Sequence, residues 1–156
     1  MYQSYQFKQK YKDINDVLYW IVEQAKVGIP YCKDKFPHWE DPRQMFYYLK
    51  NLVTFKNDPP GTELLQGPYT LFEDNYHGYL SSGAGDCDCF SILLLSCIWA
   101  QNWKGAKIIL AGNKKSAPSH IYIEIPWKGE NIILDLTESK PDQEREYKYY
   151  QALKTF

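Results

Sequence analysis

Three residues in the second half of the chain have side chains that together suit nucleophilic catalysis. Cys87 directly follows Asp86 in the stretch GAGDCDCFSILLLSCIWA (83–100), His120 precedes the run IYIEI, and Asp135 lies in the run NIILDL. A cysteine thiolate is a strong nucleophile, an imidazole can remove and return its proton, and a carboxylate can orient the imidazole. This combination of residue types is typical of acyl transfer through a covalent intermediate.

The stretch after Asp86 is expected to form a helix buried inside the domain. Asp86 is a good N-cap, because its carboxylate can accept from the free backbone N–H groups of the first turn. Apolar residues then cover nearly the whole circumference, which is typical of a buried helix. Cys87 lies at the positive end of the helix dipole, which favours a thiolate, although a buried cysteine often only fills space.

His120 and Asp135 are expected to meet because two short β-rich runs bring them together. The runs 121–125 and 131–136 flank a turn signal at 128–130 that is short enough for a hairpin. Residues 120 and 135 then fall almost opposite one another, and cross-strand side chains on one face are about 5 Å apart. Taken singly, a strand-edge histidine is more often solvated and a strand-end aspartate usually belongs to a turn. If the hairpin packs on the central helix, the side chains of Cys87, His120 and Asp135 can converge.

The remaining pattern places helices first and an antiparallel sheet second. Apolar residues recur at helical spacing over 13–26, where the sequence VGIP (27–30) is expected to end the helix, and a second helix is expected over 41–55. A further β-rich run covers 106–111, and 144–153 is expected to form a last helix. This order predicts an α+β fold in which N-terminal helices and a buried central helix pack on a C-terminal sheet.

The composition is that of an ordinary globular protein with one domain, residues 1–156. Hydrophobic residues make up 44% and charged residues 24% of the chain. The formal net charge of −1 argues against nucleic-acid binding, no segment is long enough to span a membrane, and the N-terminus has no apolar secretion signal. We therefore expect a cytoplasmic protein whose four cysteines are reduced, namely Cys32, Cys87, Cys89 and Cys97.

Two groups of side chains offer metal-ligand chemistry, but neither has a spacing typical of a metal site. The first group lies in one loop and consists of Cys32, Asp34, His38 and Glu40. The second group consists of Cys87, Cys89 and His77, and it lacks a fourth ligand. We therefore expect neither a metal nor an organic cofactor.

Tyrosine is unusually abundant, with 14 residues in the chain. Many aromatic residues lie near the two ends, at positions 2, 5, 7, 11, 147, 149 and 150. Tyrosine gives a large contact area at low entropic cost and is enriched at protein interfaces. These rings either cover a small core or form a protein-binding surface.

The motifs and their order resemble the transglutaminase-like superfamily, whose fold resembles that of papain-type cysteine peptidases. The stretches that carry the resemblance are GAGDCDCFSILLL, SHIYIEI and NIILDLT, and the upstream run NDPPGTELLQGPYTL is similar to a segment of short bacterial and prophage-encoded members. They cover roughly residues 55 to 137. The resemblance implies Cys87 as nucleophile, His120 as general base and acid, and Asp135 as the residue that orients His120.

One position departs from the family pattern, because Cys89 stands where the family usually has Asp. Two residues along a helix span about 200° around its axis, so the sulfurs of Cys87 and Cys89 cannot face the same cleft. Cys87 matches the family position and lies closest to the free N–H groups. The Asp86 and Asp88 carboxylates oppose formation of its thiolate, so the helix dipole and a protonated His120 must outweigh them.

The oxyanion of an acyl-transfer intermediate needs two hydrogen-bond donors. The backbone N–H of Cys87 is the first expected donor. Gln66 is a candidate for the second, by analogy with the side-chain amide of papain-type sites. The alternative is that Gln66 is only a polar loop residue.

The resemblance implies a cysteine hydrolase or acyltransferase that acts on a carboxamide or peptide bond of a protein or peptide substrate. Cys87 would form a thioester, which water or an amine would resolve. The alternative is a phage or prophage virion protein, in the host cytoplasm or the virion, that keeps the fold as a docking module without catalysis. The two hypotheses differ in whether the three side chains lie within hydrogen-bond reach around an open cleft.

Overall fold

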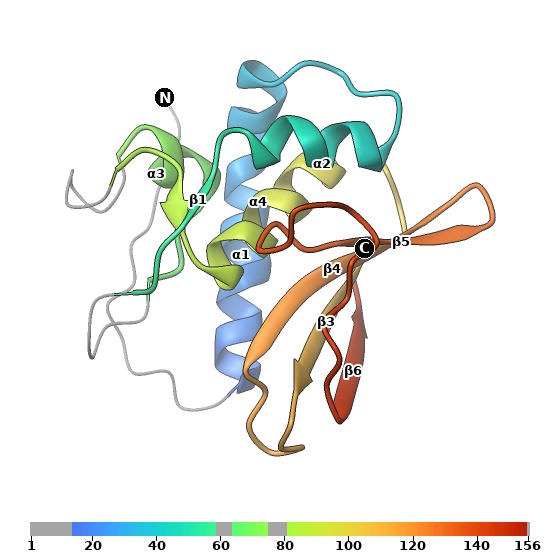
Figure 1. Ribbon diagram of the computed structural model, residues 1–156. Coiled ribbons are helices and arrows are strands. Elements are labelled where there is room, and N and C mark those ends of the chain that lie inside the picture. The colour runs from blue at the N-terminus through green and yellow to red at the C-terminus, as the bar shows by residue number, and fades with distance from the viewer. Residues whose placement is uncertain (1–13, 59–63, 75–80, 156) are drawn as a thin grey trace.

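The computed structural model describes residues 14–58, 64–74 and 81–155, and it shows helices packed on one face of an antiparallel sheet (Figure 1). The predicted α+β class is therefore confirmed. The elements in chain order are α1 (Ile14–Lys35), α2 (Pro42–Lys50), β1 (Thr54–Phe55), α3 (Pro68–Phe72), β2 (Ala84–Gly85), α4 (Cys87–Ala100), β3 (Lys107–Gly112), β4 (His120–Trp127), β5 (Glu130–Leu134) and β6 (Tyr149–Lys154).

The helix α4 is the buried centre of the protein, as its uniform apolar surface predicts. Every residue from Cys89 to Ile98 is buried. The neighbours of α4 with the most contacts are α1 on one side and β4 on the other. Each fully buried leucine or isoleucine in such a position contributes about 1.5–3 kcal/mol, so α4 fixes the arrangement of the elements around it.

The helix α1 is longer than predicted, because it continues through Gly28 and Pro30 to Lys35. Gly28 is a packing residue: a Cβ atom at this position would lie 2.6 Å from the Ser96 hydroxyl of α4. The Ser96 hydroxyl also donates to the carbonyl of Ala25, at 2.8 Å. Close packing of α1 on α4 therefore overrides the local signal that glycine and proline end the helix.

The helix α2 begins as predicted but ends at Lys50, well before Phe55. Its N-cap, Asp41, accepts from the N–H of Gln44 at 2.8 Å. The chain then turns so that β1 pairs in parallel with β2, with Phe55 opposite Gly85. Gly83 permits this turn, because its φ is +79° and a Cβ atom there would lie 2.1 Å from a backbone oxygen of residue 52.

The main sheet has the strand order β5-β4-β3-β6, and all neighbouring strands are antiparallel. The strands β4 and β5 form the predicted hairpin. Its two-residue turn, Lys128 and Gly129, has positive φ at both positions, as the favoured hairpin turns require. Along β4, Ile121 and Ile123 face the helices, whereas Tyr122 belongs to a small cluster on the opposite face.

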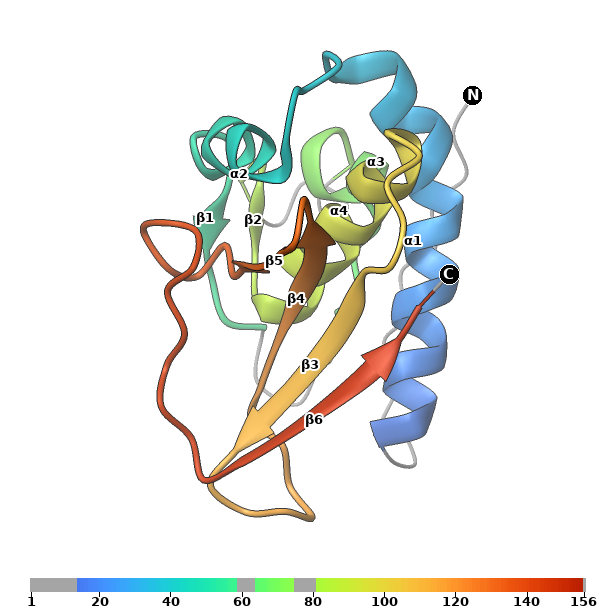
Figure 2. The same cartoon turned by 90° about the vertical axis from the view of Figure 1, so that its right-hand side faces the viewer.

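The prediction of a last helix over 144–153 is wrong. Residues 149–154 form β6, which pairs with β3 along six residues and becomes an edge strand of the sheet (Figure 2). Without β6, β3 would leave its own edge groups unpaired, and strand pairing satisfies them. Residues 138–148, which we call the C-terminal strap, lead into β6 and pack Tyr147 against the sheet face opposite the helices.

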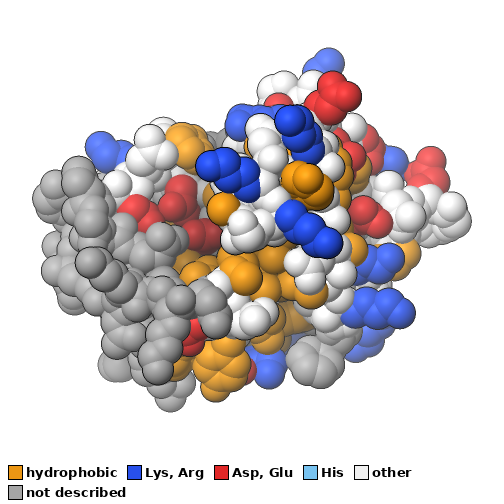
Figure 3. All heavy atoms as spheres, turned by 90° about the horizontal axis from the view of Figure 1, so that it is seen from below, with side chains coloured by type: hydrophobic (Ala, Val, Ile, Leu, Met, Phe, Trp, Pro, Cys, Tyr) orange, Lys and Arg blue, Asp and Glu red, His pale blue; other side chains and the backbone are white. Residues whose placement is uncertain are grey.

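The surface has no single dominant charge on the face that Figure 3 shows. Basic side chains there lie in separate groups, with acidic and apolar side chains between them (Figure 3). Within the described part of the chain, none of the helices has the length and apolarity needed to cross a bilayer.

Candidate active site

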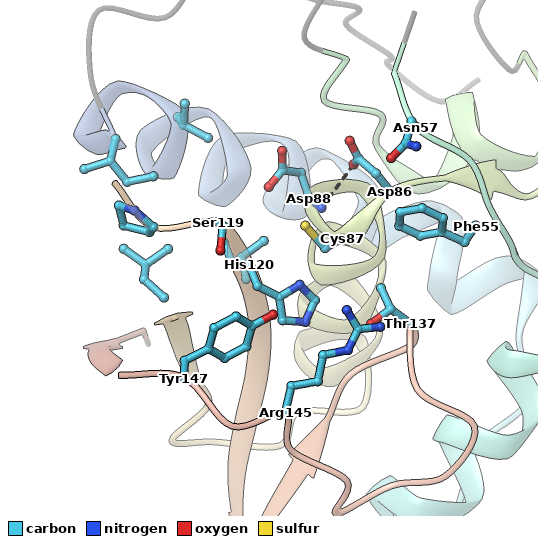
Figure 4. Close-up of a pocket in the computed structure, with 15 residues that line it drawn as sticks. Phe55, Asn57, Asp86, Cys87, Asp88, Ser119, His120, Thr137, Arg145 and Tyr147 are labelled. Carbon is cyan, nitrogen blue, oxygen red and sulfur yellow. Dashed lines mark hydrogen bonds between the residues drawn. The ribbon is translucent and has the colours of Figure 1, made fainter. Parts of the chain in front are cut away.

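Two of the three predicted catalytic residues line one cavity, and the third contacts one of them. The cavity has a volume of about 710 Å³ and lies between the first turn of α4, the start of β4 and the C-terminal strap (Figure 4). Cys87 and His120 line this cavity. Asp135, which directly follows β5, contacts the ring of His120 through its carboxylate. The first turn of the buried helix and the hairpin therefore converge at this site.

Cys87 is the first residue of α4 and follows the N-cap Asp86. The Asp86 carboxylate accepts from the N–H groups of Asp88 and Cys89, at 3.1 Å and 3.4 Å, so the predicted cap is present. Neither bond uses the N–H of Cys87 itself. The sulfur of Cys87 points into the cavity beside the His120 ring (Figure 4).

The surroundings of the Cys87 thiol disfavour its ionised form. Burial raises its pKa well above the ordinary value, and the carboxylates of Asp88 and Asp86 raise the pKa further. The backbone N–H of Ile121, at the start of β4, opposes this rise. A thiol with a raised pKa becomes a nucleophile only when an adjacent base removes its proton.

His120 and Asp135 form a buried pair whose geometry is fixed from both sides. The Nε2 atom of His120 lies 2.5 Å from Oδ2 of Asp135, and the two side chains are 7% and 4% exposed. The other oxygen of Asp135 accepts from the N–H and the hydroxyl of Thr137, at 3.0 Å and 2.6 Å. Burial alone would raise the pKa of Asp135, but the hydrogen bonds from His120 and Thr137 hold this pKa below its ordinary value.

This pairing determines which nitrogen of His120 is available to the thiol. An ionised carboxylate only accepts hydrogen bonds, so Nε2 carries a proton and donates it towards Asp135. In the neutral ring, Nδ1 is then the acceptor. Nδ1 is therefore the atom that can take the proton of Cys87.

The contact between His120 and Asp135 is diagonal, whereas the sequence predicted an almost directly opposed pair. The hairpin register pairs Ile123 with Leu134, which places position 122 opposite position 135. The hairpin turn between β4 and β5 is therefore centred one residue later in the chain than a directly opposed pair of residues 120 and 135 would require. The contact still forms, because diagonal neighbours on one face of a sheet remain within reach of long and aromatic side chains.

Two tyrosine rings lie against the imidazole of His120. The Tyr122 ring lies 5.7 Å from it, two residues along the same strand, and the Tyr147 ring from the C-terminal strap stacks at 6.0 Å. The Tyr122 hydroxyl also donates to Glu144 of the strap. The sequence analysis missed the role of Tyr147, because residues 144–153 were expected to form a helix. The abundance of tyrosine near the C-terminus was its only signal.

Cys89 faces away from the cavity, as the helical spacing predicts. It is fully buried, its sulfur lies 3.4 Å from the carbonyl oxygen of Leu64, and the Gln66 side chain donates to it at 3.6 Å. Burial raises the pKa of Cys89 well above the ordinary value. Of the two sulfurs, Cys87 is the one with access to the cavity and to His120.

Gln66, the predicted second oxyanion donor, does not line the cavity. It is 1% exposed, and its amide donates to the carbonyl of Ala84 at 3.1 Å and to the sulfur of Cys89. Gln66 is therefore placed as the alternative interpretation predicts: it is a polar loop residue that hydrogen-bonds to neighbouring buried groups. Among the described residues that line the cavity, the side-chain amide is that of Asn57, which the sequence analysis missed.

Asn57 reaches the cavity because of the short parallel pair β1–β2. The register places Thr54 opposite Ala84 and Phe55 opposite Gly85, and the N–H of Lys56 donates to the carbonyl of Gly85 at 2.8 Å. The chain therefore runs alongside the approach to α4, and Asn57 lies beside Asp86 at the rim (Figure 4). No local sequence signal predicts a parallel pair of only two residues, so this position was not foreseeable.

No protein-family model, curated protein or solved structure matches the chain significantly. The chemistry of the cavity therefore has to be inferred from its own residues. Its geometry unites a thiol, an imidazole and a carboxylate from α4, β4 and the end of β5.

Of the two groups of side chains with metal-ligand chemistry, only the first lies wholly within the described residues. Among them, no group of three or more His, Cys, Asp or Glu side chains could hold a metal ion. Cys32 is buried, with its sulfur 3.6 Å from that of Cys97. His77, the third member of the other group, lies outside the described residues.

Proposed function

We propose that the protein is a transglutaminase-like cysteine hydrolase or acyltransferase that acts on a carboxamide or peptide bond through a thioester. One observation carries this proposal. The buried contact of 2.5 Å between His120 and Asp135 stands at the wall of a cavity that Cys87 also lines. A polarised imidazole beside an accessible thiol is the arrangement that thiol acylation needs.

In the first step, the sulfur of Cys87 attacks the carbonyl carbon of the substrate. A sulfur–carbon bond forms, the thiol proton passes to Nδ1 of His120, and the carbonyl electron pair moves to the oxygen. Asp135 stabilises the imidazolium that results, because its carboxylate is ionised and already bonded to Nε2. The raised pKa of Cys87 makes this proton transfer part of the attack itself.

The oxyanion formed in this step needs donors that are in place before the reaction. The backbone N–H of Cys87 is one donor, since it lies at the start of α4 and neither N-cap bond uses it. The side-chain amide of Asn57 is the second donor, because it is the amide side chain among the described residues that line the cavity. Gln66 takes no part, since both of its donor contacts are on the Cys89 side.

In the second step, His120 returns the proton to the leaving nitrogen, the carbon–nitrogen bond breaks, and a thioester remains on Cys87. Water or an amine then attacks the thioester while His120 removes its proton. The new carbon–oxygen or carbon–nitrogen bond forms, the carbon–sulfur bond breaks, and the thiol is restored. The Asp86 and Asp88 carboxylates at the rim oppose a free thiolate and attract a cationic amine, which favours transfer to an amine as well as hydrolysis.

The proposal is tested by measuring ammonia release and fluorescent primary-amine incorporation with casein as acyl donor. We expect the wild-type protein to carry out at least one of these reactions. Cys87→Ala and His120→Ala should abolish it. Cys87→Ala should keep its melting temperature within a few degrees, whereas His120→Ala also removes the buried contact with Asp135 and should lower it. Rapid alkylation of Cys87 by iodoacetamide, mapped by mass spectrometry, provides the second readout. A wild-type Cys87 that reacts no faster with iodoacetamide than buried Cys89 would refute the proposal.

We also propose a second candidate function, a docking role in a virion or another protein assembly. The observation that favours it is the edge strand β6, on which Tyr149 and Tyr150 are each 46% exposed. An exposed strand edge with aromatic side chains can pair with a strand of a partner protein. This role predicts that Tyr149→Ser together with Tyr150→Ser abolishes co-purification with the assembly, whereas Cys87→Ala does not.

A further inference from the structure

The cavity at Cys87 carries opposite charges on its two sides. Asp86 and Asp88 lie at the start of α4, whereas Arg145 approaches from the C-terminal strap, with Cys87 and His120 between them (Figure 4). Arg145 is the only lysine or arginine among the described residues that line the cavity. A ligand that spans the reacting sulfur therefore meets a cation on one side only.

Arg145 is held in place by a residue that is itself tied to the catalytic carboxylate. Its Nε atom donates to Glu138 at 2.6 Å, and the N–H of Glu138 donates to the carbonyl of Asp135 at 2.9 Å. The hydrogen bond to Glu138 also raises the pKa of Arg145, and a side-chain hydrogen bond to Tyr147 raises it further. Because Glu138 engages Nε, the Nη atoms are the donors that a substrate carboxylate can bind beside the Tyr147 hydroxyl.

Neither stability nor the catalytic chemistry accounts for this arrangement. The side chain of Arg145 is 53% exposed, and an exposed ion pair adds little to stability. The proposed mechanism uses Cys87, His120, Asp135 and Asn57 and gives Arg145 no step. The guanidinium nevertheless points towards the space between His120 and Thr137, at the edge of the cavity (Figure 4).

We propose that Arg145 recognises a carboxylate of the substrate, so that the cavity selects acyl donors with an anionic group close to the reacting carbonyl. This inference rests on the proposed function and names the substrate class of that site. The rest of the acyl donor lies against the apolar wall that Val17, Leu110 and Ile121 contribute. The carboxylate is that of an acidic side chain or of a peptide C-terminus, since both present the same two oxygens to a guanidinium.

The test compares two reagents that differ only in charge, iodoacetate and iodoacetamide. In both reactions the Cys87 sulfur–carbon bond forms, the carbon–iodine bond breaks, iodide leaves and the thiol proton passes to solvent through His120. The measured quantity is the ratio of the two rate constants at Cys87, at one pH and at low ionic strength. Mercaptoethanol supplies the intrinsic ratio of the two reagents.

We expect Arg145→Gln to lower the iodoacetate-to-iodoacetamide ratio about fourfold, the value for a charge pair about 5 Å apart in a water-like medium. Arg145→Lys should restore most of the ratio, and high salt should reduce it in the wild type. Lys148→Gln is the matched control, because Lys148 lies on the same strap but does not line the cavity. The iodoacetamide rate itself reports whether the variants remain folded.

An equal ratio in the wild type and in Arg145→Gln would overturn the proposal while leaving the proposed function intact. A Cys87 that reacts with neither reagent would instead overturn the proposed function, and this inference with it. Protection experiments distinguish the two sources of the carboxylate. Acetyl-glycyl-glycine with a free C-terminus and N-acetyl-glutamate α-amide with a free side-chain carboxylate are compared for slowing of the iodoacetamide reaction, and acetyl-glycyl-glycinamide serves as the neutral control.

Discussion

Cys87 and Cys89 lie two residues apart in the first turn of α4, yet their sulfurs have opposite environments. Cys87 lines the cavity beside His120, whereas Cys89 is 0% exposed and contacts Leu64 and Gln66. The helical rotation of about 100° per residue produces this separation. The chemistry proposed for the site therefore belongs to one sulfur, although the sequence offers two.

Cys87→Ala should remove the rapid iodoacetamide reaction of the folded protein, and Cys89→Ala should leave it unchanged. Only Cys87 combines access to the cavity with an adjacent base, whereas a reagent reaches Cys89 only after unfolding. Mass spectrometry of tryptic peptides from native and urea-unfolded protein measures both reactivities. Native labelling that persists in Cys87→Ala and maps to Cys89 would reassign the nucleophile.

Asp88→Asn should make Cys87 more reactive, because the Asp88 carboxylate raises the pKa of the thiol. Removing this negative charge lowers the pKa, so a larger thiolate fraction is present at any pH below it. We expect the iodoacetamide rate at pH 8 to rise about twofold to fivefold, the magnitude of one partly screened charge nearby. Asp34→Asn, a change outside the cavity lining, should leave the rate unchanged.

Asp135 should contribute to stability at neutral pH and lose this contribution in acid. Its pKa is lowered in the folded state, so between the folded and unfolded pKa values the unfolded chain binds more protons, and stability rises with pH. The contribution is complete above the ordinary pKa of about 4 and disappears as the pH falls through the lowered value. Urea unfolding from pH 2.5 to 6 should show a steeper acid loss for the wild type than for Asp135→Asn; parallel curves would contradict this assignment.

Asn57 and Gln66 offer a direct comparison of two amides with different predicted roles. Asn57→Ala should lower acyl transfer by on the order of 100-fold, as loss of an oxyanion donor does, with little effect on stability because Asn57 is exposed. Its iodoacetamide rate should stay unchanged, since alkylation forms no oxyanion. Gln66→Ala should instead cost about 1–3 kcal/mol of unfolding free energy, because it leaves buried partners unsatisfied. The reverse pattern would restore Gln66 as the oxyanion donor.

The parts of the site that the sequence predicted are those that depend on local patterns. The N-cap Asp86 and the apolar run after it define α4 within one stretch of chain. The turn at Lys128 and Gly129 defines the hairpin that brings His120 to Asp135. In each case neighbours in sequence determine the structure, so capping and turn chemistry are sufficient.

The parts that the sequence did not predict depend on contacts between distant segments. Residues 149–154 form a strand because β3 offers them an unpaired edge, although β3 ends 37 residues before β6 begins. Asn57 reaches the site because the preceding strand β1 pairs in parallel with β2, about 30 residues later in the chain. In such pairings, tertiary contacts outweigh the local propensity of the segment. A single sequence does not show which distant segments will pair.

Tyr147 should affect catalysis through the position of His120. Its ring stacks on the imidazole at 6.0 Å and 24°, and the strap that carries it is tied to Tyr122 through Glu144. Tyr147→Ala removes the stacked ring, so the imidazole can rotate, and we expect kcat to fall about tenfold with a smaller change in KM. Tyr147→Phe keeps the ring and should retain most of the activity.

The control for this prediction is Tyr149→Ala, two residues along the chain, where the side chain is 46% exposed and makes no ring contact with His120. A tenfold loss in Tyr147→Ala that Tyr147→Phe restores and that Tyr149→Ala does not reproduce would establish a positioning role. Equal losses in Tyr147→Ala and Tyr149→Ala, accompanied by equal falls in melting temperature, would show that the strap only stabilises the sheet. His120 would then owe its orientation to Asp135, because among the described residues this carboxylate is the polar group in contact with its Nε2 atom.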